Sequence, residues 1–439
     1  MKESLVEFKQ KLPNLSKGNA KALKLLIEAG RLVAPLYKQQ ENDRYPGANF
    51  YPHDSTKAEI EKAAKKNPEI LSAYTVVERK NGSLVATPYH IKYASFLKPI
   101  AEKLLKAAEV VEDKEYSKLL KLQAESLVEG DYEKALNYWL TMKPKTLSAL
   151  IGPFKRYDDK LFHIKTSYQG WVGLTDIKET ERVTEFMEAI LTSRRKVVLS
   201  TQKVDFYDKV KVKVNNALLF SGFMAKIKFV GTFLPNNIEI LEQHGAKILL
   251  FKQANTNRVE QEILPAFNEF FSSGFKSSFK KEDLAKGNMT YVFLHELAHT
   301  YLMYRSSEER LQDLYPIISE LSASIYGMKV AGSLLLKDMV NSKEMESIMV
   351  SFMCRCLYLI KQQSATALTP HYVSGGNIFI NYMIDSGALR FAEGFSIPNF
   401  MKMFVSVEEM SEILEKILAT GTRKDAETFI KKYSKKLAF

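Results

Sequence analysis

Apolar residues recur at helical spacing over long stretches of this chain. The spacing covers 23–36 and 91–140, and from residue 259 to the end it predicts helices almost throughout. Shorter runs of apolar and β-branched residues, which are typical of strands, lie between these stretches. These runs cover 164–174, 197–199, 226–233 and 246–251, with a helix expected over 179–192.

One β-hairpin is predicted by its turn. Residues 74–77 and 84–86 form short apolar runs on either side of Asn81-Gly82. This pair suits a two-residue hairpin turn, because both residues accept a positive φ angle. The chain as a whole is therefore expected to be α+β and mostly helical.

The same patterns divide the chain into three parts. We expect a mainly helical region over 1–150, which contains the hairpin near 74–88. A mixed region over 151–255 is expected to contribute the sheet, and a helical region over 256–439 follows it.

The sequence His295-Glu296-Leu297-Ala298-His299 is the most specific chemical signal in the chain. On a helix the two histidines lie about one turn and 6 Å of rise apart, so both imidazoles can reach one ion. Glu296 projects roughly 100° away, where it can act as a base but is poorly placed as a ligand. Two fixed nitrogens, a carboxylate base and an open coordination position are what a zinc hydrolase requires.

The alternative interpretation is a pair of core histidines on a buried helix. The chain has only 7 histidines, and an H-E-x-x-H pattern arises by chance roughly once per hundred chains of this composition. Apolar flanks such as Phe293 and Leu294 bury most sides of the helix, so each imidazole needs a partner, and one metal ion serves both. Asn288 or Thr290 is expected to cap the start of this helix, after Gly287.

A third metal ligand has to come from outside this pentapeptide. Glu320 is the leading candidate, because it lies in an apolar helix that begins near Pro316, where a lone carboxylate is costly unless it is paired or bound to metal. The alternative for Glu320 is a partly exposed helix residue. Glu308 and Glu309 are rival ligands, but they follow the first helix directly and are typical of solvated charges.

Composition narrows the remaining possibilities. The chain has 439 residues with 46% hydrophobic and 26% charged side chains, and no apolar run approaches a membrane span, so a cytoplasmic location is expected. Cys354 and Cys356 are too few for a disulfide framework or a structural zinc site. The net charge of +12 comes mostly from lysines spread along the chain without a nucleic-acid-binding motif, so nucleic acid is not the expected partner.

Further blocks of sequence accompany the pentapeptide. They are Asn49-Phe50-Tyr51-Pro52-His53-Asp54, Ile151-Gly152-Pro153-Phe154-Lys155-Arg156-Tyr157-Asp158, Leu234-Pro235-Asn236-Asn237 and Glu320-Leu321-Ser322-Ala323-Ser324. Together with the pentapeptide, this set resembles the dipeptidyl peptidase III family of zinc metallopeptidases, and it looks most similar to a short branch linked to nudix hydrolases. No nudix box is present in the sequence.

The resemblance implies two lobes around a cleft. One lobe is expected to be helical and to bind one zinc ion, and the other to be mixed, with a small barrel-like antiparallel sheet that binds peptide. The resemblance implies His295, His299 and Glu320 as the zinc ligands and Glu296 as the general base that activates the zinc-bound water.

The resemblance also implies a histidine in a later helix that stabilises the transition state, and His371 is the candidate for it. The alternatives are that His371 is only a helix-entry residue after Pro370, and that a cleft tyrosine such as Tyr157 takes this role.

The same resemblance concerns the contacts to a peptide substrate. Gly152 and Tyr157 match the peptide-binding segment of the family, and Asn236 matches a polar contact to the peptide. Ser148 and Phe233 stand where the family carries Glu and Asn for the peptide amino group. We therefore expect peptide-bond hydrolysis, with the choice between exopeptidase and endopeptidase left open.

Two serines replace acidic residues of the family near the expected ligands. Ser319 and Ser324 stand where the family has carboxylates, and one of these is expected to orient a ligand histidine. The loss of such a group costs roughly 10–100-fold in metal affinity or activity. The alternative function is therefore a catalytically degenerate homologue that binds peptides or proteins without turnover.

Overall fold

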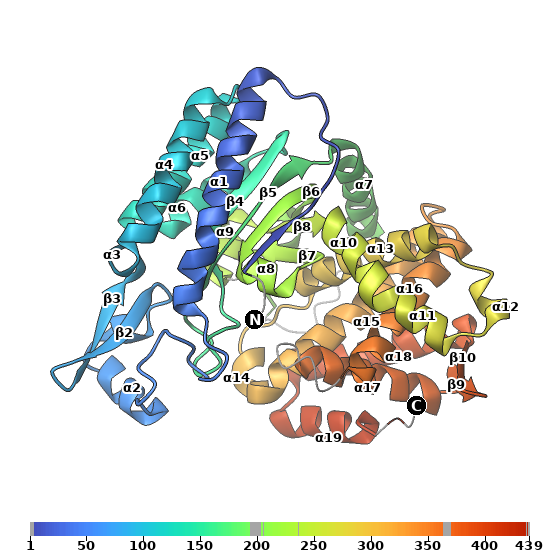
Figure 1. Ribbon diagram of the computed structural model, residues 1–439. Coiled ribbons are helices and arrows are strands. Elements are labelled where there is room, and N and C mark those ends of the chain that lie inside the picture. The colour runs from blue at the N-terminus through green and yellow to red at the C-terminus, as the bar shows by residue number, and fades with distance from the viewer. Residues whose placement is uncertain are drawn as a thin grey trace. The chain divides into compact units, whose positions relative to one another are not determined.

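The computed structural model describes residues 4–193, 203–204, 206–235, 237–362, 370–435 and 437 (Figure 1). The chain falls into two compact units. One comprises Met1–Ile177, Lys213–Phe229 and Leu234–His244, and the other comprises Lys178–Val212, Val230–Phe233 and Gly245–Phe439. The structure is α+β and mostly helical, which confirms the predicted fold class, whereas the three-part division stays a prediction.

The first unit combines helices with an antiparallel sheet. Its helices are α1 (Lys17–Gln40), α2 (Lys57–Ala64), η1 (Pro68–Leu71), α3 (Tyr89–Lys92), α4 (Ala94–Val110), α5 (Lys114–Glu129), α6 (Tyr132–Thr141), α8 (Phe223–Ile227) and α9 (Ile238–His244). Its strands are β1 (Leu5–Glu7), β2 (Thr75–Lys80), β3 (Ser83–Pro88), β4 (Leu147–Lys155), β5 (Ser167–Thr175) and β6 (Lys211–Gly222). Strands β4, β5 and β6 pair antiparallel in that order, and β1 pairs with β6.

Helix α1 packs across this sheet because one of its faces is apolar. Leu26, Val33 and Leu36 on that face are fully buried. Figure 1 shows α1 lying over β4 and β5, which it contacts. The register shifts once in the β4–β5 pair and once in the β5–β6 pair, and such irregularities bend a sheet and increase its twist. A small, curled antiparallel sheet in the mixed unit is as predicted.

The predicted hairpin is confirmed as β2 and β3. Lys80 pairs with Ser83 across the turn, and Asn81 and Gly82 adopt φ angles of 49° and 76°. Both turn residues are thus left-handed, as the Asn-Gly pair predicts.

Lys165 is a buried cation in the first unit. Its Nζ donates hydrogen bonds to the carbonyl oxygens of Ile70 and Ser72, both at 2.8 Å, and to Thr75 Oγ1 at 2.7 Å. Burial lowers the pKa of Lys165 to about 7, against the charge of Asp159, which raises it. The hydrogen bonds of Lys165 therefore connect η1 and the start of β2 to the segment before β5.

The second unit is predominantly helical. Its helices are α7 (Ile177–Ser193), η2 (Tyr207–Lys209), α10 (Lys252–Arg258), η3 (Val259–Ile263), α11 (Leu264–Phe270), α12 (Ser273–Lys276), α13 (Lys281–Tyr301), α14 (Ser307–Leu311), η4 (Gln312–Leu314), α15 (Tyr315–Leu336), α16 (Ser342–Lys361), α17 (Pro370–Asp385), α18 (Phe400–Thr420) and α19 (Arg423–Tyr433). Its strands are β7 (Gly231–Leu234), β8 (Lys247–Phe251), β9 (Leu389–Ala392) and β10 (Phe395–Pro398). The predominance of helices after residue 259 confirms the pattern in the sequence.

The strand predictions need correction in three places. Strands β4 and most of β6 fall where no strand is predicted, and within 226–233 the strand begins only at Gly231. Asn215 and Asn216 interrupt the apolar alternation of β6, which hides it, yet Asn215 Oδ1 accepts a hydrogen bond from the buried Ser148 hydroxyl at 2.7 Å. The predicted run 197–199 lies outside the described residues.

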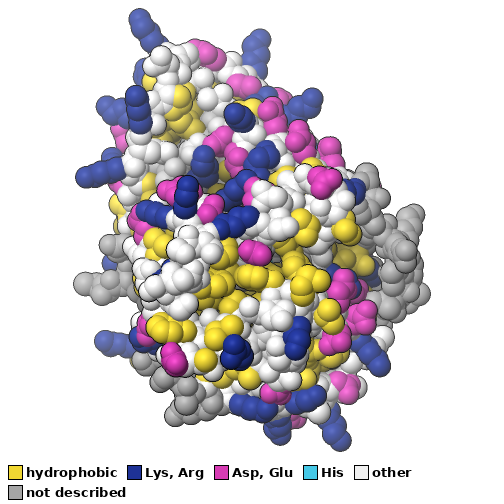
Figure 2. All heavy atoms as spheres, turned by 90° about the vertical axis from the view of Figure 1, so that its right-hand side faces the viewer, with side chains coloured by type: hydrophobic (Ala, Val, Ile, Leu, Met, Phe, Trp, Pro, Cys, Tyr) yellow, Lys and Arg dark blue, Asp and Glu magenta, His cyan; other side chains and the backbone are white. Residues whose placement is uncertain are grey.

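Charged side chains are dispersed on the face drawn in Figure 2. Lys and Arg side chains are spread over that face among acidic, apolar and other side chains, and do not form one continuous basic patch. Among the described helices, none is both long and apolar enough to cross a membrane.

Candidate metal centre

Helix α13 carries the two histidines of the pentapeptide through the interior of the helical unit. The helix begins at Lys281. Its start is capped by the Asp283 carboxylate, which accepts a hydrogen bond from the Lys280 N–H at 2.8 Å. The prediction that it starts at Asn288 or Thr290 is therefore wrong, because the charged first turns lack the apolar spacing that marks a buried helix. Beyond those turns α13 is buried on nearly all sides, since α15 and α16 pack against it.

Helix α15, which carries Glu320, approaches α13 very closely at Gly327. A Cβ atom at Gly327 would lie 2.9 Å from the carbonyl carbon of Leu294 and 3.1 Å from the backbone nitrogen of His295. These are backbone atoms that cannot move aside, so only glycine permits this approach. The contact therefore fixes the distance between the helix of Glu320 and the backbone of His295.

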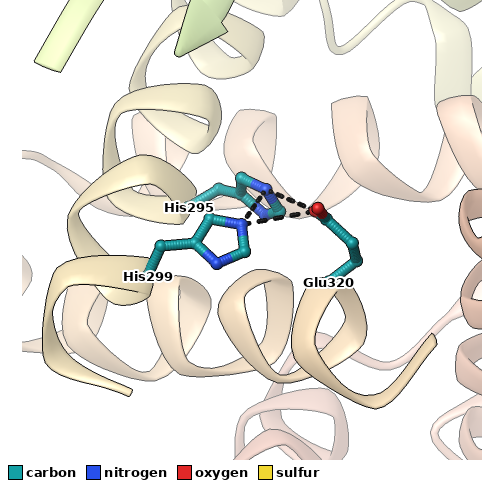
Figure 3. Close-up of side chains that lie close together, drawn as sticks. All are labelled: His295, His299 and Glu320. Carbon is teal, nitrogen blue, oxygen red and sulfur yellow. Dashed lines mark hydrogen bonds and ion pairs between the residues drawn. The ribbon is translucent and has the colours of Figure 1, made fainter. Parts of the chain in front are cut away.

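Three side chains converge between these two helices (Figure 3). His295 Nε2 and His299 Nε2 lie 3.1 Å apart. Glu320 Oε2 lies 3.2 Å from His295 Nε2 and 3.3 Å from His299 Nε2. The rival ligands Glu308 and Glu309 are exposed on α14 and do not belong to this group. Glu320 is thus the acid that the fold brings to the histidines.

The group fits a zinc ion in chemistry and in dimensions. Two imidazole nitrogens and one carboxylate oxygen are common zinc donors, and bonds of about 2.1 Å in a tetrahedron place donor atoms roughly 3.4 Å apart. The three separations of 3.1–3.3 Å are close to this value. Over the described ranges, these three residues are the cluster of His, Cys, Asp or Glu that could hold a metal ion.

A buried serine determines which nitrogen of His295 carries the proton. Ser324 Oγ donates its only hydrogen to the Glu320 carbonyl oxygen at 2.9 Å. Its oxygen must then accept from the Tyr291 hydroxyl at 2.9 Å and from His295 Nδ1–H at 3.1 Å. His295 is therefore protonated on Nδ1, and the lone pair of Nε2 faces Glu320 and His299, as a metal ligand requires.

Glu296 lies beside the group without belonging to it. The residue follows His295 on α13 and is partly exposed. Strand β7 passes close to it, because a Cβ atom at Gly231 would lie 2.4 Å from Val292 Cγ1 and 3.3 Å from Glu296 Oε1. Gly231 therefore lets the strand backbone cover the side of α13 that presents Glu296.

The charges at the centre are strongly coupled. Burial raises the pKa of Glu320, but His299 and His295 lower it more, so this pKa lies well below its usual range. Burial also lowers the pKa of His371 on α17, against the charge of Glu320, which raises it. Glu320 is therefore ionised, and His371 lies near it as a neutral imidazole at neutral pH.

Two solved structures are similar in fold to this chain over nearly its full length. The structure of DPP III from Caldithrix abyssi has a TM-score of 0.85 at 20% identity and covers 96% of this chain and 91% of that chain. The structure of dipeptidyl-peptidase III from Corallococcus sp. strain EGB has a TM-score of 0.82 at 19% identity and covers 98% of this chain and 90% of that chain. This chain has the dipeptidyl peptidase III fold. The resemblance seen in the sequence is thereby confirmed for the fold.

A sequence relative carries a different name. Nudix hydrolase 3 from Arabidopsis thaliana is 25% identical over 426 residues, which cover 88% of this chain and 54% of that protein. The chain thus spans about half the length of this curated relative. No family model matches the chain.

Within the dipeptidyl peptidase III fold, the residues expected to contact peptide lie in several places. Gly152 is on β4, and Tyr157 follows that strand with its exposed ring stacked on Phe223 at 5.7 Å. Both belong to the first unit, so their part in a peptide site stays a prediction. Asn236 lies outside the described residues. His371 is the second residue of α17, in the same unit as the metal group.

Two residues of the centre were not assigned from sequence. Tyr291 lies four positions before His295, so its place on the same helix face was a usable signal for a residue that supports the ligand. Gly231 carried no local signal, because its role depends on β7 passing over α13, a contact between segments far apart in sequence.

Proposed function

We propose that this protein is a zinc-dependent metallopeptidase that hydrolyses peptide bonds. The convergence of His295 Nε2, His299 Nε2 and Glu320 Oε2 carries this proposal. The dipeptidyl peptidase III fold of the two structural neighbours supports a peptide as the substrate. Both observations agree with the resemblance in the sequence.

The chemistry divides between the metal and the protein. His295, His299 and Glu320 hold the ion, and bound zinc lowers the pKa of water toward about 7 and polarises a carbonyl group. The Glu296 carboxylate accepts the proton of the attacking water and delivers it to the leaving amine. Ser324 keeps the hydrogen of His295 on Nδ1 throughout.

The negative charge that develops on the peptide oxygen needs a hydrogen-bond donor. The neutral imidazole of His371 is one candidate, since it lies in the same unit as the ligands and near Glu320. The hydroxyl of Tyr157, an exposed residue, is the other. Gly152, Tyr157 and Asn236 complete the proposed contacts to the peptide.

A second candidate function is peptide binding without turnover. It is favoured by Ser148, which stands where the family is expected to anchor the peptide amino group. The Ser148 hydroxyl is buried, donates to Asn215 Oδ1 at 2.7 Å and accepts from Trp171 Nε1 at 3.3 Å. These contacts hold the Ser148 side chain within the sheet. The protein therefore lacks one of the groups expected to bind the peptide amino end, which the release of dipeptides requires.

The variant Glu296→Gln tests the proposed function, because an amide keeps the shape of the side chain but cannot accept a proton. We expect the variant to retain one zinc per chain and to lose roughly 10²–10⁴-fold in the rate of peptide hydrolysis. Zinc content after dialysis and digestion of a peptide library, read by mass spectrometry, provide the two measurements.

The matched control is Glu308→Gln, which makes the same chemical change at an exposed position of α14. It is expected to digest peptides like the wild type. Equal digestion by Glu296→Gln and the wild type would rule out the proposed base. A wild-type protein that neither retains zinc nor cleaves peptides favours the binding function.

A further inference from the structure

A second group of charged side chains is partly buried in the helical unit. Arg258 ends α10, Glu262 lies in η3 and Arg355 lies in α16, and their side chains are 15%, 27% and 14% exposed. Arg355 Nη1 donates a hydrogen bond to Glu262 Oε2, and Arg258 Nε lies 4.0 Å from the same oxygen. One carboxylate therefore serves two guanidinium groups, and the group carries a net charge of +1.

Arg258 is poorly satisfied in this arrangement. In the part of the chain that the structure describes, its guanidinium donates no hydrogen bond, although it carries five N–H groups. Burial and, after it, the charge of Arg355 lower the pKa of Arg258 to about 10, against the charge of Glu262, which raises it. The side chain is partly exposed, and the net positive charge of the group favours an additional negative partner.

Two tyrosines border the arginines and connect them to the metal centre. The Tyr372 ring centroid lies 6.0 Å from Arg355 Cζ, and Tyr372 directly follows His371 on α17. Burial raises the pKa of Tyr291, while the charges of Arg355 and Arg258 lower it, so both guanidinium groups lie near that hydroxyl. The Tyr291 hydroxyl is the one bonded to Ser324 beside His295.

We infer that Arg258 and Arg355 form a binding site for a single carboxylate group. A guanidinium fork matches the two oxygens of a carboxylate, and Arg258 has its donors available for one. A bound carboxylate neutralises the excess charge and supplies the acceptors that Arg258 lacks. Glu262 shares the site with this ligand and, being of like charge, limits how tightly the ligand binds.

Such a carboxylate has two sources. It is the terminal group of every peptide, and it is also found in small free acids. The terminal group is the source that extends the proposed function, since it gives short peptides an anchor at their carboxyl end. The binding of a carboxylate to the arginines does not itself require that function.

Binding is measured by calorimetry on the full-length protein after removal of metal by a chelator, in chloride-free buffer. Removing the metal prevents a carboxylate from binding at His295, His299 and Glu320 instead. The probes are acetate, N-acetyl-alanyl-alanine and the same peptide with an amidated end. We expect the free-acid peptide to bind and the amide not to bind. Acetate binding as tightly as the acid peptide assigns the site to small free acids, and weaker acetate binding assigns it to peptide ends.

Two variants change the affinity in opposite directions. Arg258→Met is expected to weaken binding of the free-acid peptide by about tenfold or more, because a charged hydrogen-bond pair is lost. Glu262→Gln removes the competing charge at unchanged size and is expected to tighten binding several-fold. Arg423→Met, at an exposed arginine paired with Asp313, is the control and leaves binding unchanged. Absence of carboxylate binding to the wild type, or Glu262→Gln binding no more tightly than wild type, overturns the inference.

Discussion

A single hydroxyl hydrogen determines the hydrogen-bond directions at the candidate metal centre. Because Ser324 donates that hydrogen to the Glu320 carbonyl, both Tyr291 and His295 must donate to the serine oxygen. Ser324 thus accepts the hydrogen bond of His295 Nδ1–H, as a carboxylate does in many metal sites, but it carries no negative charge. A neutral acceptor orients the ring and raises its basicity less than a carboxylate would.

Ser324→Ala removes the acceptor for His295 Nδ1–H and is expected to weaken zinc binding by roughly 10–100-fold. Affinity is measured by competition with a chromophoric chelator, which does not depend on catalysis. Ser322→Ala is the matched control, because Ser322 is also buried on α15 and donates to the carbonyl oxygen four residues earlier, at 2.6 Å. Equal zinc affinities for the two variants would show that the serine does not support the ligand.

Lys165 makes stability depend on pH. Its pKa in the folded protein is about 7. The pKa of a lysine in an unfolded chain is about 10.4. Between pH 7 and this value the unfolded chain binds more protons than the folded protein, so the free energy of unfolding rises with pH. The free energy of unfolding of the wild type, relative to Lys165→Met, is expected to increase by roughly 1–2 kcal/mol from pH 7 to pH 8.5.

Urea denaturation at the two pH values measures this difference. The control is Lys80→Met, which changes an exposed lysine at the end of β2. Its free energy of unfolding should match that of the wild type at both pH values. If the difference in the free energy of unfolding between the wild type and Lys165→Met stays constant with pH, the result contradicts a lowered pKa of Lys165.

At the scale of elements, the crossing of α13 and α15 positions the proposed ligands. Gly327→Ala places a methyl group against the backbone of Leu294 and His295 and is expected to cost about 1–3 kcal/mol of stability and to weaken zinc binding. Gly332→Ala is the control on the same helix, because a Cβ atom there meets nothing within 4 Å. That change is expected to be neutral or to stabilise by up to about 1 kcal/mol.

Thermal unfolding and chelator competition measure the two effects of Gly327→Ala. If Gly327→Ala and Gly332→Ala behave alike in both measurements, the close approach of the helices does not determine the site.

The sequence predicted those elements whose signal is local. The Asn81-Gly82 turn and the helices after residue 259 have turn residues or apolar spacing of their own, and both are confirmed. Strand β6 was missed, because Asn215 and Asn216 interrupt its apolar alternation, and the acceptor role of Asn215 Oδ1 depends on Ser148 in a distant segment. Gly231 was missed for the same reason. Glu320 was found, since a carboxylate in an apolar helix demands a partner even before the partner is known.

At the scale of the whole molecule, metal binding is expected to stabilise the helical unit. Zinc at about 100 times its dissociation constant adds roughly 2.7 kcal/mol to the free energy of unfolding of the unit that binds it. Thermal unfolding with zinc and with a chelator measures the gain, and hydrogen exchange locates it. Exchange should slow in α13 and α15 and stay unchanged in β4 and β5.

The variants Glu320→Gln and Glu309→Gln complete this experiment. The first removes a ligand and should abolish most of the zinc-dependent gain, whereas the second changes an exposed acid and should preserve it. Zinc-dependent stabilisation of Glu320→Gln equal to that of the wild type would exclude Glu320 as a ligand.

The order of segments along the chain limits how the metal centre can be inherited. Val230–Phe233 belongs to the helical unit, but Leu234–His244 of the other unit separates it from Gly245–Phe439. A gene fragment that starts at Gly245 encodes all three ligands and yet omits Gly231, whose strand lies over Glu296. Recombination that keeps this strand together with the proposed ligands must therefore also carry Leu234–His244, a segment of the other unit.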